Sequence, residues 1–299
     1  MNRAKGEVMN IQNYSIIAGS EACNARCPYC ISKMTPLQGV DAKEPDVNWR
    51  NFRKGTMLAK QERVTTALIT GKGEPTLFPR QISKFIDVLS EYEFPLIELQ
   101  TNGILFGEQE KKYANWLKQW YDKGLTTIAV SVVHYDNEKN RQVFLPHKKS
   151  YPDLAKTVEM LHNTGYCVRL SCIMAKDYID SVAGLEKMIS FSKKNNVEQL
   201  TLRPVNKPEK SRNDSVYEWA REHHIKDKRL DEIVNFLAAH GHPLRNLAHG
   251  GTVYDVEGQN VCLSNSLTIK PDSDEIRQLI FFPDGHLRYD WQYAGAILL

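Results

Sequence analysis

Short apolar runs alternate along the chain with longer segments whose apolar residues recur at helical spacing. Six of the runs are short and rich in β-branched residues, which predicts strands over residues 14–18, 65–70, 95–101, 126–133, 166–174 and 199–205. Between them, apolar positions at i, i+3, i+4 and i+7 predict amphipathic helices, as at Ile82, Phe85, Ile86 and Leu89. The alternation predicts an α/β fold in which helices connect parallel strands.

The number of these units predicts a partial barrel of the (β/α)6 type. A closed eight-stranded barrel needs two further strand–helix units, and residues 206–299 do not supply them cleanly. In this tail, residues 216–240 have helical spacing, and the sequence Pro-Asp-Gly at 283–285 separates two strand-like runs, which is typical of a β-hairpin. We therefore expect a barrel in residues 1–205 and, in residues 206–299, a C-terminal α+β extension that caps the barrel mouth.

Residues 32–62 have no clear hydrophobic period. Pro36 and Gly39 interrupt the stretch, and Trp49 and Phe52 lie among charged residues. This pattern predicts a long loop with a short helix, and the alternative is a surface insertion with an aromatic anchor.

Composition and charge are those of an ordinary globular protein. Of the 299 residues, 41% are hydrophobic and 25% are charged. No apolar run approaches the ~20 residues of a membrane span, and residues 1–10 lack the apolar region of a secretory signal. We therefore expect a cytoplasmic protein with no membrane partner. The net charge of +3 gives no support for a large nucleic-acid footprint.

Three of the six cysteines, Cys23, Cys27 and Cys30, lie within eight residues in a C-x3-C-x2-C pattern. Six cysteines in a chain of this length are not a disulfide framework, and clustered cysteines in a cytosolic protein more often bind metal. Three thiolates on one loop can hold three irons of a [4Fe–4S] cluster and leave the fourth iron open. The loop follows the first predicted strand, at the end where parallel α/β barrels carry their active sites.

The cysteine pattern, with Tyr29 before its last cysteine, resembles the cluster loop of the radical S-adenosylmethionine (SAM) superfamily. After the second predicted strand, the stretch 71–75, Gly-Lys-Gly-Glu-Pro, resembles the Gly-Gly-Glu-Pro motif of that family, with Lys72 in place of the second glycine. The resemblance covers residues 14–205 and is closest to the broad group of molybdenum-cofactor cyclase-like and peptide-modifying members. It implies a six-stranded partial barrel and one [4Fe–4S] cluster, whose open iron is chelated by the amino and carboxylate groups of SAM.

The resemblance implies roles for the residues that match its motifs. The cluster ligands would be Cys23, Cys27 and Cys30. The backbone of the turn would accept hydrogen bonds from the amino group of SAM, and Tyr29 would lie near its adenine. The turn residues concerned are Gly71, Gly73 and Glu74.

Three further residues are candidates by position alone. Ser131, in the fourth predicted strand, matches a position that often contacts the ribose or carboxylate of SAM in the family. Arg169, in the fifth, is suited to pair with the SAM carboxylate, and Asn102, at the end of the third, could reach ribose or substrate. The alternatives are a strand-end hydrogen bond for Ser131 and Asn102, and a surface charge for Arg169.

The remaining cysteines do not suggest a second cluster. Cys167 and Cys172 are five residues apart on one predicted strand, so they face opposite sides, and each is expected to be a small buried residue. Cys262 is alone in the tail and is either a structural residue or a catalytic hydrogen donor. The sequence therefore predicts one cluster.

The resemblance implies an oxygen-sensitive enzyme that cleaves SAM reductively to methionine and a 5′-deoxyadenosyl radical, which abstracts hydrogen from a substrate. It also implies an electron donor such as flavodoxin or ferredoxin. The first strand begins near Tyr14 with no separate peptide-recognition domain before it, which favours a small polar substrate, a nucleotide or metabolite. Modification of a ribosomally made peptide or protein is the enzymatic alternative. A non-catalytic iron–sulfur or metal-binding scaffold is the alternative of another class, and the SAM-like turn argues against it.

Overall fold

The strands of the described residues form one sheet that combines the two predicted parts of the chain. The computed structural model describes residues 10–36, 39–40, 43–205, 211–247, 251–264, 275–291 and 293–299. Over these residues the 11-stranded sheet has the order β11-β10-β1-β2-β3-β4-β5-β6-β9-β8-β7. The strands are β1 (Asn10–Ile17), β2 (Thr66–Thr70), β3 (Leu96–Thr101), β4 (Thr127–Val132), β5 (Cys167–Met174), β6 (Gln199–Pro204), β7 (His242–Asn246), β8 (Thr252–Val256), β9 (Gln259–Leu263), β10 (Glu275–Phe281) and β11 (Leu287–Arg288).

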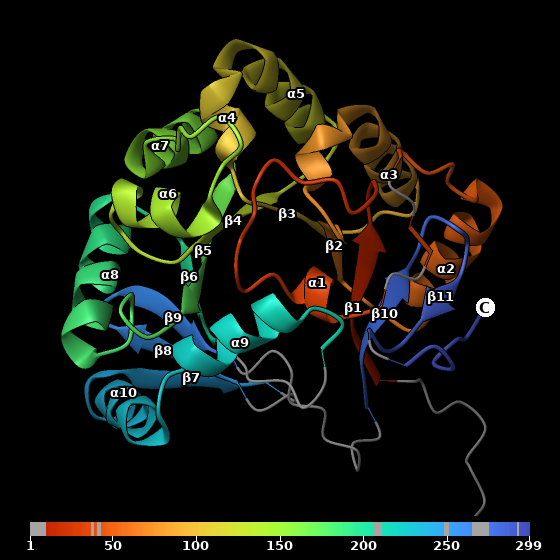
Figure 1. The fold of residues 1–299 in the computed structure, drawn as a ribbon. Coiled ribbons are helices and arrows are strands. Elements are labelled where there is room, and N and C mark those ends of the chain that lie inside the picture. The colour runs from red at the N-terminus through yellow and green to blue at the C-terminus, as the bar shows by residue number, and fades with distance from the viewer. Residues whose placement is uncertain are drawn as a thin grey trace, which may run out of the picture.

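Parallel pairing dominates this sheet. Every pair of neighbours from β10 through β1–β6 to β9 is parallel, and only the outermost pairs at the two ends are antiparallel. The described strands curve into a ring that does not close, since its order begins at β11 and ends at β7. The predicted fold class, an open α/β barrel, is confirmed (Figure 1).

Helices cover the outer face of this ring. Most of them surround the strands in Figure 1, whereas α1 and α9 lie across the centre. The helices are α1 (Ile31–Met34), α2 (Trp49–Gln61), the 3-10 helix η1 (Pro75–Leu77), α3 (Pro79–Glu91), α4 (Ile104–Glu108), α5 (Glu110–Asp122), α6 (Asn137–Phe144), α7 (Leu154–Thr164), α8 (Val182–Lys194), α9 (Asp214–His223) and α10 (Asp227–His240). Within the described ranges, none of the helices combines the length and the apolar character needed to cross a membrane.

Alternation along each strand separates an apolar outer face from a polar inner face. In β3, Ile97 and Leu99 are buried in the core beneath the helices, so Glu98 and Gln100 point to the inner face. We call the space along this inner face the lumen, and its end at the carboxyl ends of β1–β6 the mouth. The same alternation assigns further polar or thiol side chains to the lumen: Ser15, Ser131, Arg169, Ser171, Thr201, Arg203 and Cys262.

The prediction for residues 32–62 was wrong in part, because a full helix of 13 residues, α2, begins at Trp49. Asn48 caps it by accepting a hydrogen bond from Asn51 N. Phe52 is completely buried against the sheet, and a Cβ on Gly55 would lie 3.0 Å from Tyr14 Oη. A glycine at this close approach weakens the helical signal of the sequence, which is why the helix was not predicted at full length.

The tail contributes more to the sheet than its sequence indicates. The predicted hairpin is confirmed as β10 and β11, but β10 also pairs in parallel with β1. At the other end, β9 pairs in parallel with β6. Glu257 and Gly258 both have positive φ, at 51° and 86°, and join β8 to β9 in a tight turn. The tail thus supplies the two parallel strands that its sequence does not show cleanly.

One segment of the tail lies at the mouth, as expected for a cap. The backbone of residues 211–224 contacts the barrel through Arg212 N, which donates to Met34 O at 3.2 Å, and through His223 O, which accepts from Lys176 N at 2.8 Å. The boundary after Val205 stays a prediction. The sequence analysis of residues 1–10 concerns residues that, apart from Asn10, lie outside the described ranges.

Candidate functional site

The three clustered cysteines lie at the mouth, on the loop that follows β1. We call residues 18–30 the cysteine loop. Its backbone is anchored beyond the end of β4, since Arg26 N donates to Phe144 O at 2.8 Å and His147 N donates to Asn24 O at 3.0 Å. The three thiols are free and partly exposed, as iron binding requires.

Burial raises the pKa of two thiols on the cysteine loop, Cys23 and Cys27. The pKa of the Cys23 thiol is raised to about 12, first by burial and second by the Glu74 charge. Burial also raises the pKa of Cys27 well above its usual range, and the neighbouring thiols add to the rise. Metal ligation would therefore displace protons from these sulfurs.

The donor set of three thiols fits an iron–sulfur cluster. In the described part of the chain, no three Cys, His, Asp or Glu side chains are grouped so that they could hold one metal ion. A [4Fe–4S] cluster differs in this respect, because each cysteine binds a separate iron. In addition, Asn24 Nδ2 is enclosed on this loop with no hydrogen-bond partner among the described residues. Cluster sulfurs accept hydrogen bonds from such amide groups.

The glycine turn, residues 71–75, packs directly on the cysteine loop. Glu74 N donates to Ala22 O at 2.9 Å, and a Cβ on Gly73 would lie 2.0 Å from the same oxygen. A Cβ on Gly71 would lie 3.1 Å from the carbonyl oxygen of Ala18. Both glycines therefore serve a close contact between two backbone segments, which joins the two motifs into one unit.

The side chain of Glu74 connects this turn to the end of β3. The carboxylate is 3% exposed. It accepts hydrogen bonds from Thr76 N at 3.0 Å, Thr76 Oγ1 at 2.7 Å, Thr101 Oγ1 at 2.6 Å and Asn102 N at 2.9 Å. Burial raises the pKa of the carboxyl group and these hydrogen bonds oppose the rise. Both oxygens are engaged within the protein, so the Glu74 side chain positions the turn.

Lys72, the residue that departs from the family motif, turns toward the segment after the cysteines. Its Nζ donates to Thr35 Oγ1 at 2.8 Å and to Pro36 O at 3.2 Å, and lies 5.3 Å from the centre of the Trp291 ring. The pKa of this amine is lowered to about 8, mainly by burial and in smaller part by the charge of Arg212. Lys72 thus links the turn, the segment after α1 and the tail.

Asn102 lies against the cysteine loop. Its Nδ2 donates to Asn24 Oδ1 at 2.7 Å and lies 3.9 Å from Cys23 Sγ, while its Oδ1 accepts from Ile104 N at 3.0 Å. The structure therefore joins this predicted residue to the cluster loop. Contact with ribose or substrate stays a prediction.

Ser131 and Arg169 both face the lumen, at different depths. Ser131 is half-buried on β4 opposite Ser171 of β5. Arg169, near the start of β5, forms an ion pair with Glu98, and both side chains are largely buried, so the surface-charge alternative is wrong. Five residues of β5 separate Arg169 from the carboxyl end of its strand, a rise of about 16 Å. Their contacts with SAM stay predictions, and for Arg169 this placement gives no support.

Tyr29 takes part in an aromatic cluster between the cysteine loop and the tail. Its ring centre lies 6.3 Å from that of Phe144 and 5.7 Å from that of Trp219 on α9. Trp219 in turn stacks on His223 with ring centres 4.0 Å apart. Contact between Tyr29 and adenine stays a prediction.

Cys167 and Cys172 face opposite sides of β5, as their spacing predicts, but the predicted burial is confirmed only for Cys172, because Cys167 is partly exposed. Cys172 is fully buried in the outer core. Cys262 is on the lumen face of β9, where it is paired in register with Thr201. Its role as a hydrogen donor stays a prediction.

Three residues that were not predicted from the sequence lie beside the predicted ones. Asn24 contacts Asn102, Glu98 pairs with Arg169, and Arg203 lies near that ion pair. A charged residue at the centre of an apolar strand, as with Glu98, is the signal that was available. The partner of Glu98 could not be predicted in the same way, because it lies on another strand and depends on how the strands pair.

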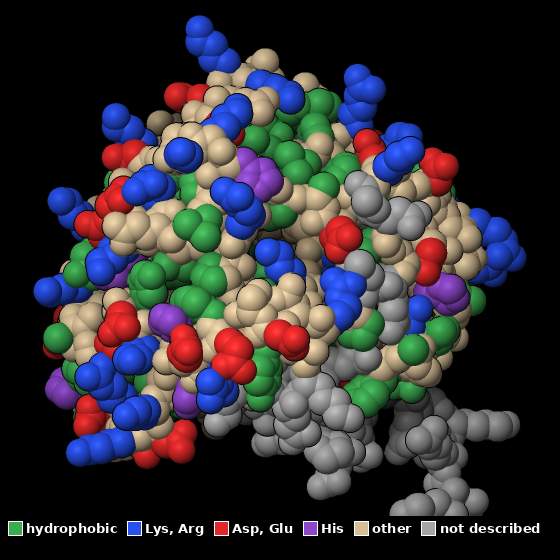
Figure 2. All heavy atoms as spheres, viewed as in Figure 1, with side chains coloured by type: hydrophobic (Ala, Val, Ile, Leu, Met, Phe, Trp, Pro, Cys, Tyr) green, Lys and Arg blue, Asp and Glu red, His purple; other side chains and the backbone are tan. Residues whose placement is uncertain are grey.

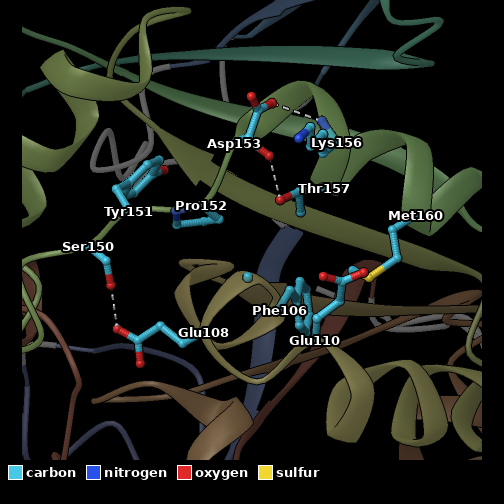
Figure 3. Close-up of a pocket in the computed structure, with 11 residues that line it drawn as sticks. Phe106, Glu108, Glu110, Ser150, Tyr151, Pro152, Asp153, Lys156, Thr157 and Met160 are labelled. Carbon is cyan, nitrogen blue, oxygen red and sulfur yellow. Dashed lines mark hydrogen bonds between the residues drawn. The ribbon is translucent and has the colours of Figure 1, made fainter.

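A surface cavity of about 290 Å³ lies elsewhere, among α4, α5 and α7. Figure 3 shows hydrogen bonds among its lining residues: Ser150 Oγ donates to Glu108 Oε1 at 3.5 Å, and Thr157 Oγ1 donates to the backbone oxygen of Asp153 at 2.9 Å. Asp153 also caps α7. The cavity belongs to the helical layer, not to the mouth.

An open α/β barrel with a three-cysteine loop and a glycine turn on neighbouring strands defines a class of protein, the iron–sulfur enzymes that use SAM. The family model of the radical SAM superfamily matches residues 17–181, more than half of the chain. The chain belongs to the radical SAM superfamily. Members of this family are enzymes that use a [4Fe–4S] cluster and SAM.

Two relatives in sequence each match somewhat more than half of the chain. The GTP 3′,8-cyclase of Campylobacter lari is 31% identical over 171 residues, which are 56% of this chain and 49% of that protein. The molybdenum cofactor biosynthesis protein moc-5 of Caenorhabditis elegans is 26% identical over 170 residues, 56% of this chain and 26% of that protein. The chain thus spans about half or less of the length of these curated relatives.

Solved structures support the fold. Streptococcus suis SuiB bound to S-adenosylmethionine superimposes with a TM-score of 0.59 at 14% identity, covering 96% of this chain and 60% of that one. Methylornithine synthase (PylB) does so with a TM-score of 0.54 at 14% identity, covering 89% and 74%. At these identities the likeness concerns the fold alone.

Proposed function

We propose that this chain binds one [4Fe–4S] cluster through Cys23, Cys27 and Cys30, and SAM beside the glycine turn, and that it cleaves SAM reductively. The observation that carries the proposal is the direct contact between the two motifs, through the Glu74 N to Ala22 O hydrogen bond and the close approach at Gly73. A ligand on the turn therefore also lies beside the cysteine loop. A scaffold that only stored metal would not need this turn.

The cluster, when bound, supplies an electron to the sulfonium of SAM, and the family chemistry then yields methionine and a 5′-deoxyadenosyl radical that abstracts hydrogen from a substrate. The residues of this chain position and shield that chemistry. Glu74 fixes the turn, and Asn24 and Asn102 offer amide groups beside the loop. Tyr29 and Trp219 cover one side of the loop and exclude water there.

A small polar molecule, a nucleotide or metabolite, is the substrate that we propose. The polar lumen below the mouth and the similarity to proteins named GTP 3′,8-cyclase support this choice. An electron donor such as flavodoxin or ferredoxin is the proposed partner. Because the six cysteines are free and a cluster at the mouth would react with oxygen, the proposed compartment is the cytoplasm.

Paramagnetic resonance of the reduced, reconstituted protein tests the binding part of this proposal. SAM is expected to change the signal of the reduced cluster, because it binds the open iron. Cys23→Ala, Cys27→Ala and Cys30→Ala are each expected to lose most of the bound iron, whereas the matched control Cys167→Ala keeps it. A signal that SAM leaves unchanged would favour the scaffold alternative.

A further inference from the structure

The lumen contains a positive charge that the protein does not balance. On β6, Leu200 and Leu202 are buried in the outer core, so Arg203 points to the lumen. Arg203 forms no ion pair and no hydrogen bond through its side chain within the described residues, and its Nε is enclosed without a partner. An Arg side chain in this state is costly unless an anion pairs with it.

A second guanidinium group lies close to the first. Arg203 interacts electrostatically with Arg169, and with Glu98, the carboxylate that pairs with Arg169. Glu98 also accepts a hydrogen bond from Gln100 Nε2 at 2.9 Å, so one carboxylate is shared among several donors. In the part of the chain that the structure describes, Arg169 Nε is likewise enclosed without a partner. Arg277 also acts electrostatically on Arg203, so the arginines here outnumber the one carboxylate, Glu98, and leave a net positive charge.

The position of Arg203 suits a ligand that enters from the mouth. In the sheet register, Arg203 lies level with Ile173, one residue from the carboxyl end of β5, while Arg169 lies deeper, level with Gln199. The molecule, viewed as in Figure 1, is hollowed near the centre of this face, and Lys and Arg side chains lie beside the hollow (Figure 2). A polar ligand can thus approach the arginines past the cysteine loop.

We propose that Arg203, together with Arg169, forms a lumenal subsite for an oxyanion group of the substrate, a phosphate or a carboxylate. The planar fork of Arg matches both groups, with two parallel hydrogen bonds. The inference rests on the proposed function and narrows its substrate to a small molecule that carries such an anion. It assigns Arg203 to substrate binding and not to the carboxylate of SAM.

Calorimetric titration of the reconstituted holoenzyme, anaerobic and at constant ionic strength, tests this subsite. The probes are inorganic phosphate, pyrophosphate and succinate, each with SAM present. Saturable binding is expected for at least one probe, and the preference between the phosphates and succinate identifies the anion. Arg203→Gln is expected to weaken that binding roughly tenfold to hundredfold, and Arg203→Lys less, while the exposed Arg245→Gln serves as the matched control.

Two results would overturn the subsite. One is the absence of saturable binding of every probe to the wild type. The other is an Arg203→Gln variant that unfolds at the wild-type temperature but loses affinity for SAM and none for the probe, because Arg203 would then hold the SAM carboxylate. If the protein binds a probe but never cleaves SAM, the subsite proposal is supported. The proposed function is then refuted.

Discussion

Gly73 has no room for a side chain, because the backbone of the cysteine loop lies directly against it. Its missing Cβ is what allows the glycine turn and the cysteine loop to meet, since a methyl group there would lie 2.0 Å from Ala22 O and 2.7 Å from the Ala22 carbonyl carbon. Backbone atoms cannot turn away as a flexible side chain can. At the scale of single residues, the site therefore depends on this contact and on the buried Glu74 beside it.

Gly73→Ala is expected to separate the two motifs. The free energy of unfolding should fall by about 2 kcal/mol or more, as with other overpacked positions, and SAM binding should weaken with it. Denaturant unfolding measures the first effect. Gly295→Ala is the matched control, because a Cβ at Gly295 meets nothing within 4 Å. Equal stability of the two variants would contradict the close contact.

Lys72 gives a pH dependence with a defined sign. Its pKa in the folded protein is lowered to about 8, mainly by burial, so at higher pH the unfolded chain binds more protons than the folded one. At neutral pH, burial of the charged amine lowers the free energy of unfolding. This cost disappears as the pH rises above 8, because the amine then loses its proton in the folded protein. From pH ~7.5 to ~9.5, the unfolding free energy of the metal-free wild type should rise by about 1–2 kcal/mol relative to Lys72→Met.

Denaturant unfolding at several pH values, under reducing conditions, measures this difference. The exposed Lys111→Met controls for the loss of a lysine. If the unfolding free energies of the wild type and Lys72→Met change equally with pH across this range, Lys72 is not buried as the structure places it.

Much of the site could be predicted residue by residue, and its connections could not. The spacing of Cys23, Cys27 and Cys30 and the glycines of the turn are local signals that one short stretch contains. The meeting of Gly73 with Ala22, and of Arg169 with Glu98, joins residues about 50 or more positions apart. Such contacts depend on strand register, which no local pattern fixes.

At the scale of elements, α9 is the helix that most affects access to the site. It follows the barrel strands in sequence and lies across the mouth (Figure 1), where Trp219 packs on Tyr29 of the cysteine loop. Its helical period was predicted correctly from the sequence. The ring contact was not, because Tyr29 belongs to a loop without regular structure.

Trp219→Ala is expected to make the bound cluster more sensitive to oxygen. The lost aromatic contact is worth about 1 kcal/mol, which corresponds to roughly fivefold more of any open state of the helix. Visible absorbance of the reconstituted protein, followed after exposure to air, measures the rate of cluster loss. Glu218→Ala, exposed on the same helix, should match the wild type. A Trp219→Ala rate equal to that of the control would show that α9 does not shield the cluster.

At the scale of the whole molecule, the tail and the barrel share one sheet. The strand–helix alternation predicted the parallel core, and the hairpin at β10 and β11 was also predicted. The parallel pairing of β10 with β1 and of β9 with β6 was not, because pairing between strands so far apart in sequence leaves no local pattern. Strands from both sides of Val205 therefore belong to one sheet, and the boundary after Val205 stays a prediction.

A chain that ends at Val205 tests how far the two parts depend on each other. It would lose the neighbours of β1 and β6, together with buried side chains such as Leu279, Phe281 and Val261. Both edges of the parallel sheet would then be exposed. We expect no cooperative unfolding transition by circular dichroism for residues 1–205. A sharp transition with native-like helix content would instead show that the barrel is an independent domain.

Cleavage of SAM by the reconstituted protein is the most direct test of the central claim. The anaerobic, cluster-loaded protein is mixed with dithionite and SAM, and 5′-deoxyadenosine and methionine are measured by chromatography. Both products are expected in equal amounts from the wild type and from Cys167→Ala, and neither from Cys23→Ala. A cluster-loaded wild type that yields no 5′-deoxyadenosine with dithionite or with a stronger reductant would contradict the assignment of this site to radical SAM chemistry.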